Sequence, residues 1–270
     1  MMIRMWVLAA ATIVGAAAAG EAADRADGFA AEFAGPIEKA HGAEAWESHE
    51  AVRFDFAMTK PDGSPRLKAT IIFETGPERV RMELADGTVA VWDGRDAWVA
   101  PADSDFAAGK PRFHLRTWTY FLASPFKLRD PGSTLSALPD APLMEGASAK
   151  LERAKLTFGK GVGDSPEDWY IAYREPKRGR LKGLAYIVTY GGADPDQAAE
   201  NAHAVVYEAF ETVEGVTLPT KWTFRNYSEE AAVHGPLLFK VDVSNIEFVT
   251  PDPDAFEKPD GAKRVPLPEE

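Results

Sequence analysis

The sequence predicts an α+β protein in which an antiparallel β-sheet curls around a few helices. Segments with strand-type alternation far outnumber the two segments with helical spacing, and turn residues separate most of the strands. Strands and helices do not alternate along the chain, as they would in a doubly wound parallel sheet. A curled sheet has a concave face that helices or a ligand must fill, so any binding site is expected there.

The first predicted helix covers residues 23–41. Its apolar side chains recur at spacings of three and four, which places them on one helical face: Phe29, Phe33, Ile37 and Ala40. Pro36 lacks a backbone donor and predicts a break or kink, with two shorter helices as an alternative. Gly42 is expected to end the helix, because glycine readily adopts the left-handed conformation found at helix ends.

The strands are predicted from alternation and from turn chemistry. Apolar and polar side chains alternate from residue 52, and the Asp93-Gly94 pair is a strong hairpin signal. The predicted strands cover residues 52–58, 67–75, 79–84, 88–92, 97–100, 149–158, 169–174, 184–190, 204–210, 216–226 and 239–248.

A second helix is predicted over residues 113–123, in the middle of the chain. Its apolar side chains cluster with mixed helical spacing: Phe113, Leu115, Trp118, Phe121 and Leu122. Pro125 limits the helix to the preceding residues. The segment that follows, to residue 147, is rich in Pro, Gly and Ser and is predicted to be a loop that covers or borders a cavity.

Composition excludes several function classes. With 45% hydrophobic and 11% aromatic residues, the chain has enough apolar material for a folded core. It contains no cysteine, which excludes disulfides, thiolate metal sites, a cysteine nucleophile and a lipid anchor on an N-terminal cysteine. The net charge of −12 argues against a nucleic-acid binder and against simple electrostatic docking on an anionic membrane.

The N-terminus has the pattern of a secretory signal peptide over residues 1–19. Arg4 is followed by an apolar stretch over residues 5–14 and by small residues that place cleavage between 19 and 23. The alternative, a membrane anchor, is disfavoured because the stretch becomes weakly hydrophobic after Val14. We therefore expect one domain over residues 20–250, then a Pro-rich acidic tail over 251–270 that is extended or poorly ordered. The expected compartment is a Gram-negative periplasm, with release outside the cell as the alternative.

Two segments, VWDGRDAWVAP and GVTLPTKWTF, resemble the LolA/LolB lipoprotein-carrier superfamily. Three more, RFHLRTWTYFLASPFKLRDPG, GVGDSPEDWYIAY and AYIVTYG, are similar to a branch of LolA-like secreted proteins of unassigned function. The resemblance implies a highly curved, unclosed antiparallel barrel, with an N-terminal helix and a central helical insert covering its concave face. A LolB-type receptor carries a lipidated cysteine, which this chain lacks.

Candidate chemistry is limited. We find no GxSxG elbow, P-loop, HExxH or GxGxxG before a helix, and the scattered histidines predict no metal site and no cofactor. Asp164, Glu167 and Asp168 suggest Ca²⁺ ligands or a carboxylate pair, but a turn capped by Asp164 is the favoured interpretation. His114 and Arg116 form a cationic pair that suits an anionic headgroup, with solvated arginines on a packed helix as the alternative.

Large side chains supply the candidate lining of a hydrophobic cavity, with ordinary core packing as the alternative for each residue. The candidates are Phe54, Phe56, Met82, Trp92, Trp98, His114, Arg116, Trp118, Tyr120, Trp169, Tyr186 and Trp222.

The leading hypothesis is a soluble, non-catalytic binding protein that holds a lipid, an acyl chain or a lipidated partner in this cavity. We expect its partner to be a hydrophobic small molecule or a lipidated protein, not a nucleic acid, and the chain to be a monomer. Two alternatives stay open. One is a secreted hydrolase-type enzyme that uses the His114/Arg116 region. The other is an envelope interaction or sensor module with a filled core and no ligand.

Overall fold

The computed structural model describes residues 27–267 of the chain. The predicted signal peptide and its cleavage site lie outside these residues and stay a prediction. The strands are β1 (Ala51–Thr59), β2 (Pro65–Glu74), β3 (Val80–Leu84), β4 (Val89–Trp92), β5 (Ala97–Ala100), β6 (Ser133–Ala141), β7 (Leu151–Phe158), β8 (Trp169–Arg174), β9 (Leu181–Tyr186), β10 (His203–Val213), β11 (Val216–Ser228), β12 (Ala232–Val249) and β13 (Lys263–Val265).

Helices are few among the described residues. An N-terminal helix covers residues 27–41 of the described chain. The others are α2 (Ala43–Ser48), α3 (Asp105–Ala108), α4 (Pro111–Ala123), the 3-10 helix η1 (Ser124–Phe126) and α5 (Pro195–Glu200).

The strands form one 13-stranded sheet in the order β13-β5-β4-β3-β2-β1-β12-β11-β10-β9-β8-β7-β6. Neighbouring strands pair antiparallel, and the sheet ends in two edges, β13 and β6, so it is not closed. Two meanders, β1 to β5 and β6 to β12, are joined by the pairing of β1 with β12. The predicted fold class, an α+β half-barrel with an unclosed antiparallel sheet, is confirmed.

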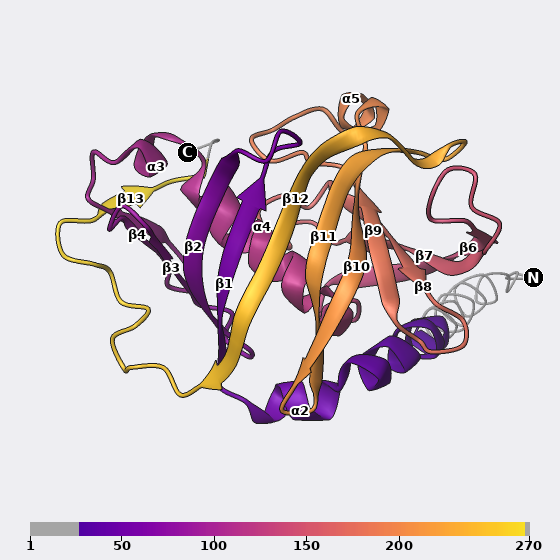
Figure 1. Ribbon diagram of the computed structural model, residues 1–270, viewed down its shortest axis with the longest axis horizontal. Coiled ribbons are helices and arrows are strands. Elements are labelled where there is room, and N and C mark those ends of the chain that lie inside the picture. The colour runs from indigo at the N-terminus through magenta and orange to yellow at the C-terminus, as the bar shows by residue number, and fades with distance from the viewer. Residues whose placement is uncertain (1–26, 268–270) are drawn as a thin grey trace, which may run out of the picture.

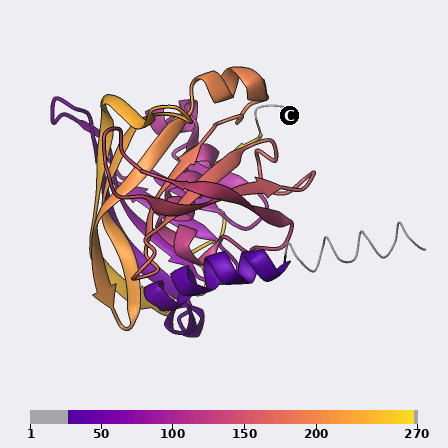
Figure 2. The ribbon, with the colours of Figure 1, turned by 90° about the vertical axis from the view of Figure 1, so that its right-hand side faces the viewer.

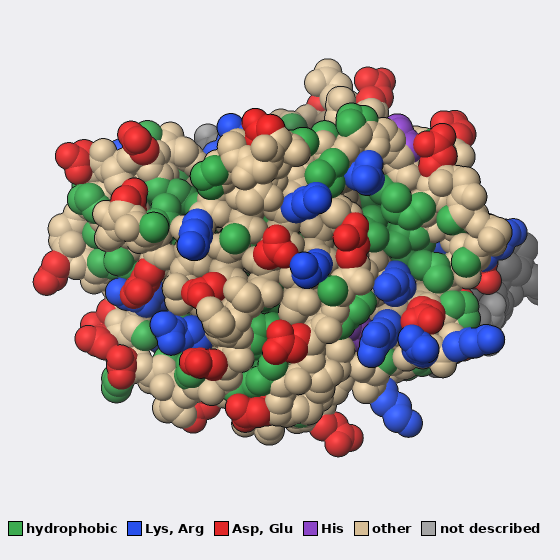
Figure 3. Space-filling model, in the orientation of Figure 1, with side chains coloured by type: hydrophobic (Ala, Val, Ile, Leu, Met, Phe, Trp, Pro, Cys, Tyr) green, Lys and Arg blue, Asp and Glu red, His purple; other side chains and the backbone are tan. Residues whose placement is uncertain are grey.

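Helix α4 crosses the concave side of this sheet and lies in the connection between β5, next to one edge, and β6 at the other (Figure 1). Seen from the side, the sheet curves around α4, while the N-terminal helix lies along one end of the strands (Figure 2). Trp118 and Phe121 of α4 are buried against the inner face, where Phe56 and Phe224 contact them with ring centroids 5.5 Å and 5.7 Å apart. The outer face carries interspersed acidic and basic side chains (Figure 3).

The N-terminal helix continues through Pro36, where a break or kink was expected. Proline has no N–H to donate, so it leaves the carbonyl one turn earlier without its helical partner. Arg174 at the end of β8 supplies that donor: its Nη1 donates to the carbonyls of Glu32 (2.8 Å) and Phe33 (2.7 Å). Gly42 then ends the helix in the left-handed conformation, at a φ of 80°, as predicted.

The short helices α3 and α5 were not predicted, and strand β9 ends at Tyr186 where a strand over 184–190 was expected. Two other segments differ more. The segment expected to be a loop up to residue 147 contains strand β6, which pairs with β7. Its Pro139 is tolerated because β6 lies at a sheet edge. Part of the expected tail is packed: Phe256 is buried beside Val91, and β13 pairs with β5.

His41 fastens the N-terminal helix to the sheet. Its Nδ1 lies 2.7 Å from the carbonyl of Thr217, and the amide of Leu181 donates to its Nε2 at 3.2 Å. A carbonyl only accepts and an amide N–H only donates, so both bonds require the neutral ring with its proton on Nδ1. Burial lowers the pKa of His41 from 6.5 to about 4.

His41 makes stability depend on pH. Because its pKa is lower in the folded state, the unfolded chain takes up a proton between pH 6.5 and 4, and stability falls as pH falls through that window. We predict that His41→Gln is less stable at pH 7 but loses less stability on acidification. On going from pH 7 to pH 4, the wild type should lose about 3 kcal/mol more of its unfolding free energy than the variant does. Urea unfolding across this pH range measures both losses.

Burial also lowers the pKa of His114 to about 4. The unfolding free energy of His41→Gln should therefore still decrease somewhat as the pH falls. If the unfolding free energies of the wild type and of His41→Gln depended equally on pH, His41 would not be a source of the pH dependence.

Candidate ligand pocket

A cavity of about 310 Å³ lies between α4, the β7–β8 loop and the inner face of β8 and β9. Helix α4 covers the centre of the concave face and leaves this space beside it. Most of its walls are apolar, which suits an apolar ligand better than a free ion. The apolar lining consists of Phe73, Val80, Phe113, Phe121, Pro131, Phe158, Val162 and Val188.

Three tyrosines form one side of the cavity: Tyr120 from α4, Tyr170 from β8 and Tyr186 from β9. Tyr170 and Tyr186 are cross-strand partners, with rings stacked 5.9 Å apart, and the rings of Tyr120 and Tyr170 lie 5.2 Å apart. Burial raises the pKa of all three hydroxyls, so they stay neutral. None of these hydroxyls has a hydrogen-bond partner in the part of the chain that the structure describes, so all three are available to a ligand.

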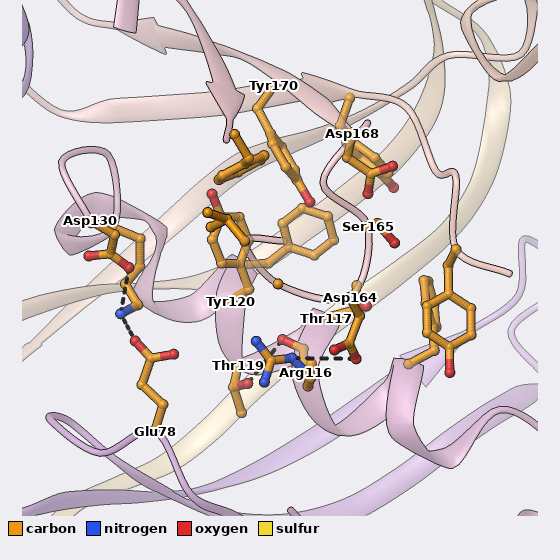
Figure 4. A pocket seen from close by; sticks show the side chains of 18 of the residues that line it. Glu78, Arg116, Thr117, Thr119, Tyr120, Asp130, Asp164, Ser165, Asp168 and Tyr170 are labelled. Carbon is orange, nitrogen blue, oxygen red and sulfur yellow. Dashed lines mark hydrogen bonds and ion pairs between the residues drawn. The ribbon is translucent and has the colours of Figure 1, made fainter. Parts of the chain in front are cut away.

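Asp168 adds a carboxylate on the same side of the cavity as the Tyr170 hydroxyl (Figure 4). Its Oδ1 accepts from the backbone N–H of Thr189 (2.6 Å) and from the Thr189 hydroxyl (2.7 Å). Burial raises the pKa of Asp168 to about 6, against the lowering effect of these two bonds. The carboxylate is therefore largely ionised at neutral pH, with a titration close to the physiological range.

A buried ion pair holds the β7–β8 loop against α4. Arg112 donates from Nε to one oxygen of Asp164 (2.7 Å) and from a terminal nitrogen to the other (2.8 Å). The Nε of Arg116 lies 3.7 Å from the same carboxylate, and both guanidinium groups lie over the ring of Trp92. Asp164 is thus an ion-pair partner, whereas the sequence suggested a turn cap.

A second ion cluster stands on another wall (Figure 4). Lys127, just after η1, pairs with Glu78 of the β2–β3 turn and with Asp130, whose carboxylate lies 2.9 Å from Nζ. The ammonium of Lys127 is thus already balanced by carboxylates. Among the described residues, no group of three or more His, Asp or Glu side chains is arranged to hold a metal ion.

The structure brings Arg116, Tyr120 and Tyr186 of the twelve candidate residues together around this cavity. Six others are buried in the main core: Phe54, Phe56, Met82, Trp92, Trp118 and Trp222.

The other three candidates lie outside the cavity lining. Trp98 donates its indole N–H to Asp93 (2.8 Å), and Trp169 packs against the separate hydrophobic cluster that contains Ile171 and Tyr173. His114 stacks on Phe106 and Trp118 and accepts the Trp118 indole N–H at 3.0 Å.

Sequence reasoning did not single out Asp168 and Tyr170 as cavity residues. Asp168 was interpreted as part of a turn, and a turn does precede β8, where the amide of Asp168 donates to the carbonyl of Ser165. The missed signal is alternation: Asp168 and Tyr170 are two residues apart, so on a strand they share a face. Alternation alone does not indicate whether other side chains cover this face or whether it borders a cavity.

No family model and no curated protein matches the sequence. Solved structures do match. A LolA superfamily protein from Nitrosomonas europaea aligns with a TM-score of 0.51 and 13% identity, over 83% of this chain and 96% of that one. The fold is LolA-like. A DUF1329 family protein from Desulfovibrio piger aligns with a TM-score of 0.50 and 10% identity, over 83% and 96% of the two chains.

At 13% and 10% sequence identity, the similarity to these two structures shows a shared LolA-like fold and nothing more. Within residues 27–267, no helix has both the length and the apolar character needed to cross a membrane.

We predict that Asp164→Asn destabilises this LolA-like fold by about 3 kcal/mol, because it removes the carboxylate from the buried guanidinium group of Arg112 and the half-buried one of Arg116. Urea unfolding measures the change, and hydrogen exchange should report faster opening of residues 159–168.

The matched control is Asp242→Asn, which removes an exposed ion pair with Lys221 (3.7 Å). It should change stability by no more than about 0.5 kcal/mol. Similar effects of the two variants would show that the Arg112–Asp164 pair does not anchor the loop.

Proposed function

We propose that the protein is an exported, non-catalytic binding protein that holds an acyl chain, from a lipid or a lipidated partner, in this cavity. The observation that carries the proposal is a cavity of about 310 Å³ walled by apolar side chains under a LolA-like sheet. Each methylene group moved from water into such a site contributes about 0.8 kcal/mol. A short stretch of acyl chain therefore supplies enough free energy to offset the cost of association.

Binding is favoured over catalysis because His114 and Arg116 do not line the same cavity. They are two residues apart on α4, so they point in different directions. Arg116 lines the cavity, whereas His114 lies outside it, between two aromatic rings. With its pKa lowered to about 4 by burial, His114 is neutral at pH 7 and its Nδ1 already accepts from Trp118.

The cavity also favours a binding protein over an interaction module with a filled core. Three tyrosines, from α4, β8 and β9, and Asp168, in the loop before β8, line the cavity with polar groups. A cavity that only reflected imperfect packing would be lined by apolar atoms alone, because unpartnered polar groups are costly to bury. We propose that the mature chain acts as a monomer in the periplasm.

We predict that Thr117→Trp, on the cavity side of α4, blocks ligand entry. The neutral probe N-phenyl-1-naphthylamine should fluoresce on binding the wild type and be displaced by monolauroylglycerol. The variant should bind at least about tenfold more weakly, a loss of about 1.4 kcal/mol. The control is Thr134→Trp at an exposed position of β6, which should bind as the wild type does.

Equal binding by Thr117→Trp and Thr134→Trp would contradict the location of the site. Absence of saturable binding by the wild type would contradict the proposed function itself.

A further inference from the structure

The charges around the cavity do not balance, and the excess is negative. Of its cationic side chains, Arg116 shares the carboxylate of Asp164 with Arg112, and Lys127 is held by Glu78 and Asp130. Each positive charge in the lining therefore already has an acidic partner. A ligand with an anionic head would have to displace one of these carboxylates.

Asp168 is the charge that the protein leaves without a cation. Its Oδ1 is held by Thr189, a neutral residue, and no ion pair to Asp168 occurs within the described residues. Its Oδ2 is not used by these bonds, and the carboxylate lies at the cavity, on the side of the Tyr170 hydroxyl (Figure 4). A partly buried carboxylate gains most from a cationic partner, because the surrounding apolar walls weaken solvent screening.

Aromatic rings surround this end of the cavity. Tyr170 has Tyr120 at 5.2 Å, Tyr186 at 5.9 Å and Phe158 at 5.9 Å between ring centroids, in tilted, stacked and edge orientations. Rings set at different angles present several faces and edges to one space. Ammonium groups are attracted to the faces of such rings, and a carboxylate beside the rings adds a direct electrostatic attraction.

We propose that the ligand is an amphiphile with a cationic ammonium headgroup, bound between the tyrosine rings and Asp168 while its alkyl chain fills the apolar part of the cavity. This inference rests on the proposed function and adds the chemical class of the ligand's polar end. A primary ammonium would also donate to the free tyrosine hydroxyls, whereas a quaternary ammonium would use the rings and the carboxylate alone.

Three amphiphiles that share one alkyl chain and differ in their headgroup measure the contribution of the headgroup to affinity. Dodecyltrimethylammonium, dodecyl maltoside and dodecyl sulfate compete below their micelle concentrations for the bound neutral probe N-phenyl-1-naphthylamine. The ammonium compound should bind about tenfold more tightly than the maltoside, and the sulfate more weakly than the maltoside.

Asp168→Asn tests the carboxylate directly, since asparagine retains a carbonyl oxygen for Thr189. It should bring the ammonium compound to within about twofold of the maltoside and leave maltoside binding unchanged. The matched control is Glu167→Gln, which removes an exposed negative charge from the adjacent residue and should keep the preference.

The wild type provides a second readout that does not depend on the variant folding. The quaternary ammonium stays charged at every pH, while the pKa of Asp168 lies at about 6. The affinity of the ammonium compound relative to the maltoside should therefore rise about fivefold between pH 5 and pH 8. The other titratable or charged groups around the cavity are Glu78, Arg116, Tyr120, Lys127, Asp130, Asp164, Tyr170, Tyr186 and Tyr190.

Equal binding of the three amphiphiles by the wild type would overturn the ammonium inference and leave alkyl-chain binding in place. A preference that persists in Asp168→Asn would overturn the role of Asp168. If none of the three displaces the probe, alkyl-chain binding fails as well.

Discussion

Helix α4 covers the middle of the concave face of a thirteen-stranded sheet, and the place of the cavity follows from that packing. Helix α4 has only thirteen residues, so it fills the middle of the face and not its whole width. Trp118 and Phe121 bury the central strands, as the ring contacts with Phe56 and Phe224 show. Toward β8 and β9 the inner face extends past the helix, and the cavity lies there.

The position of α4 is determined at both ends. Near its first turn, Arg112 is held by Asp164 from the β7–β8 loop, which places that loop over the cavity. At its last turn, the buried hydroxyl of Tyr207 on β10 donates to the carbonyl of Phe121 (2.7 Å) and lies 2.9 Å from the Ser124 hydroxyl. Because both anchors use directional bonds to buried groups, α4 cannot shift toward β8 and close the cavity without breaking one of them.

The fold class could be predicted from sequence because it depends on local patterns. Alternation identified most strands, and Gly42 and Pro125 bounded the helices through their backbone chemistry. The exceptions have long-range causes. The N-terminal helix survives Pro36 because Arg174, from a distant strand, supplies donors to the carbonyls of the preceding turn. Strand β6 includes Pro139 and was missed, because an edge strand has only one neighbour to satisfy.

The cavity was only partly predictable, for a different physical reason. Alternation indicates which side chains point inward, but not whether a helix then covers them. Phe54 and Tyr186 are both buried on strands, yet Phe54 is enclosed within the core while Tyr186 also lines the cavity. The partners of Asp164 and Asp168 are far away in the sequence, so their ion pair and hydrogen bonds left no local signal.

The proposed ligand places its alkyl chain in the space that α4 leaves uncovered. The most direct measurement is photo-crosslinking of the native protein with a dodecyl amphiphile that carries a diazirine on its chain, followed by peptide mass mapping. Labels are expected within residues 111–123, 158–170 and 184–190, which contribute side chains to the cavity. Labels confined to the outer face of the sheet, or spread evenly over the surface, would contradict this placement.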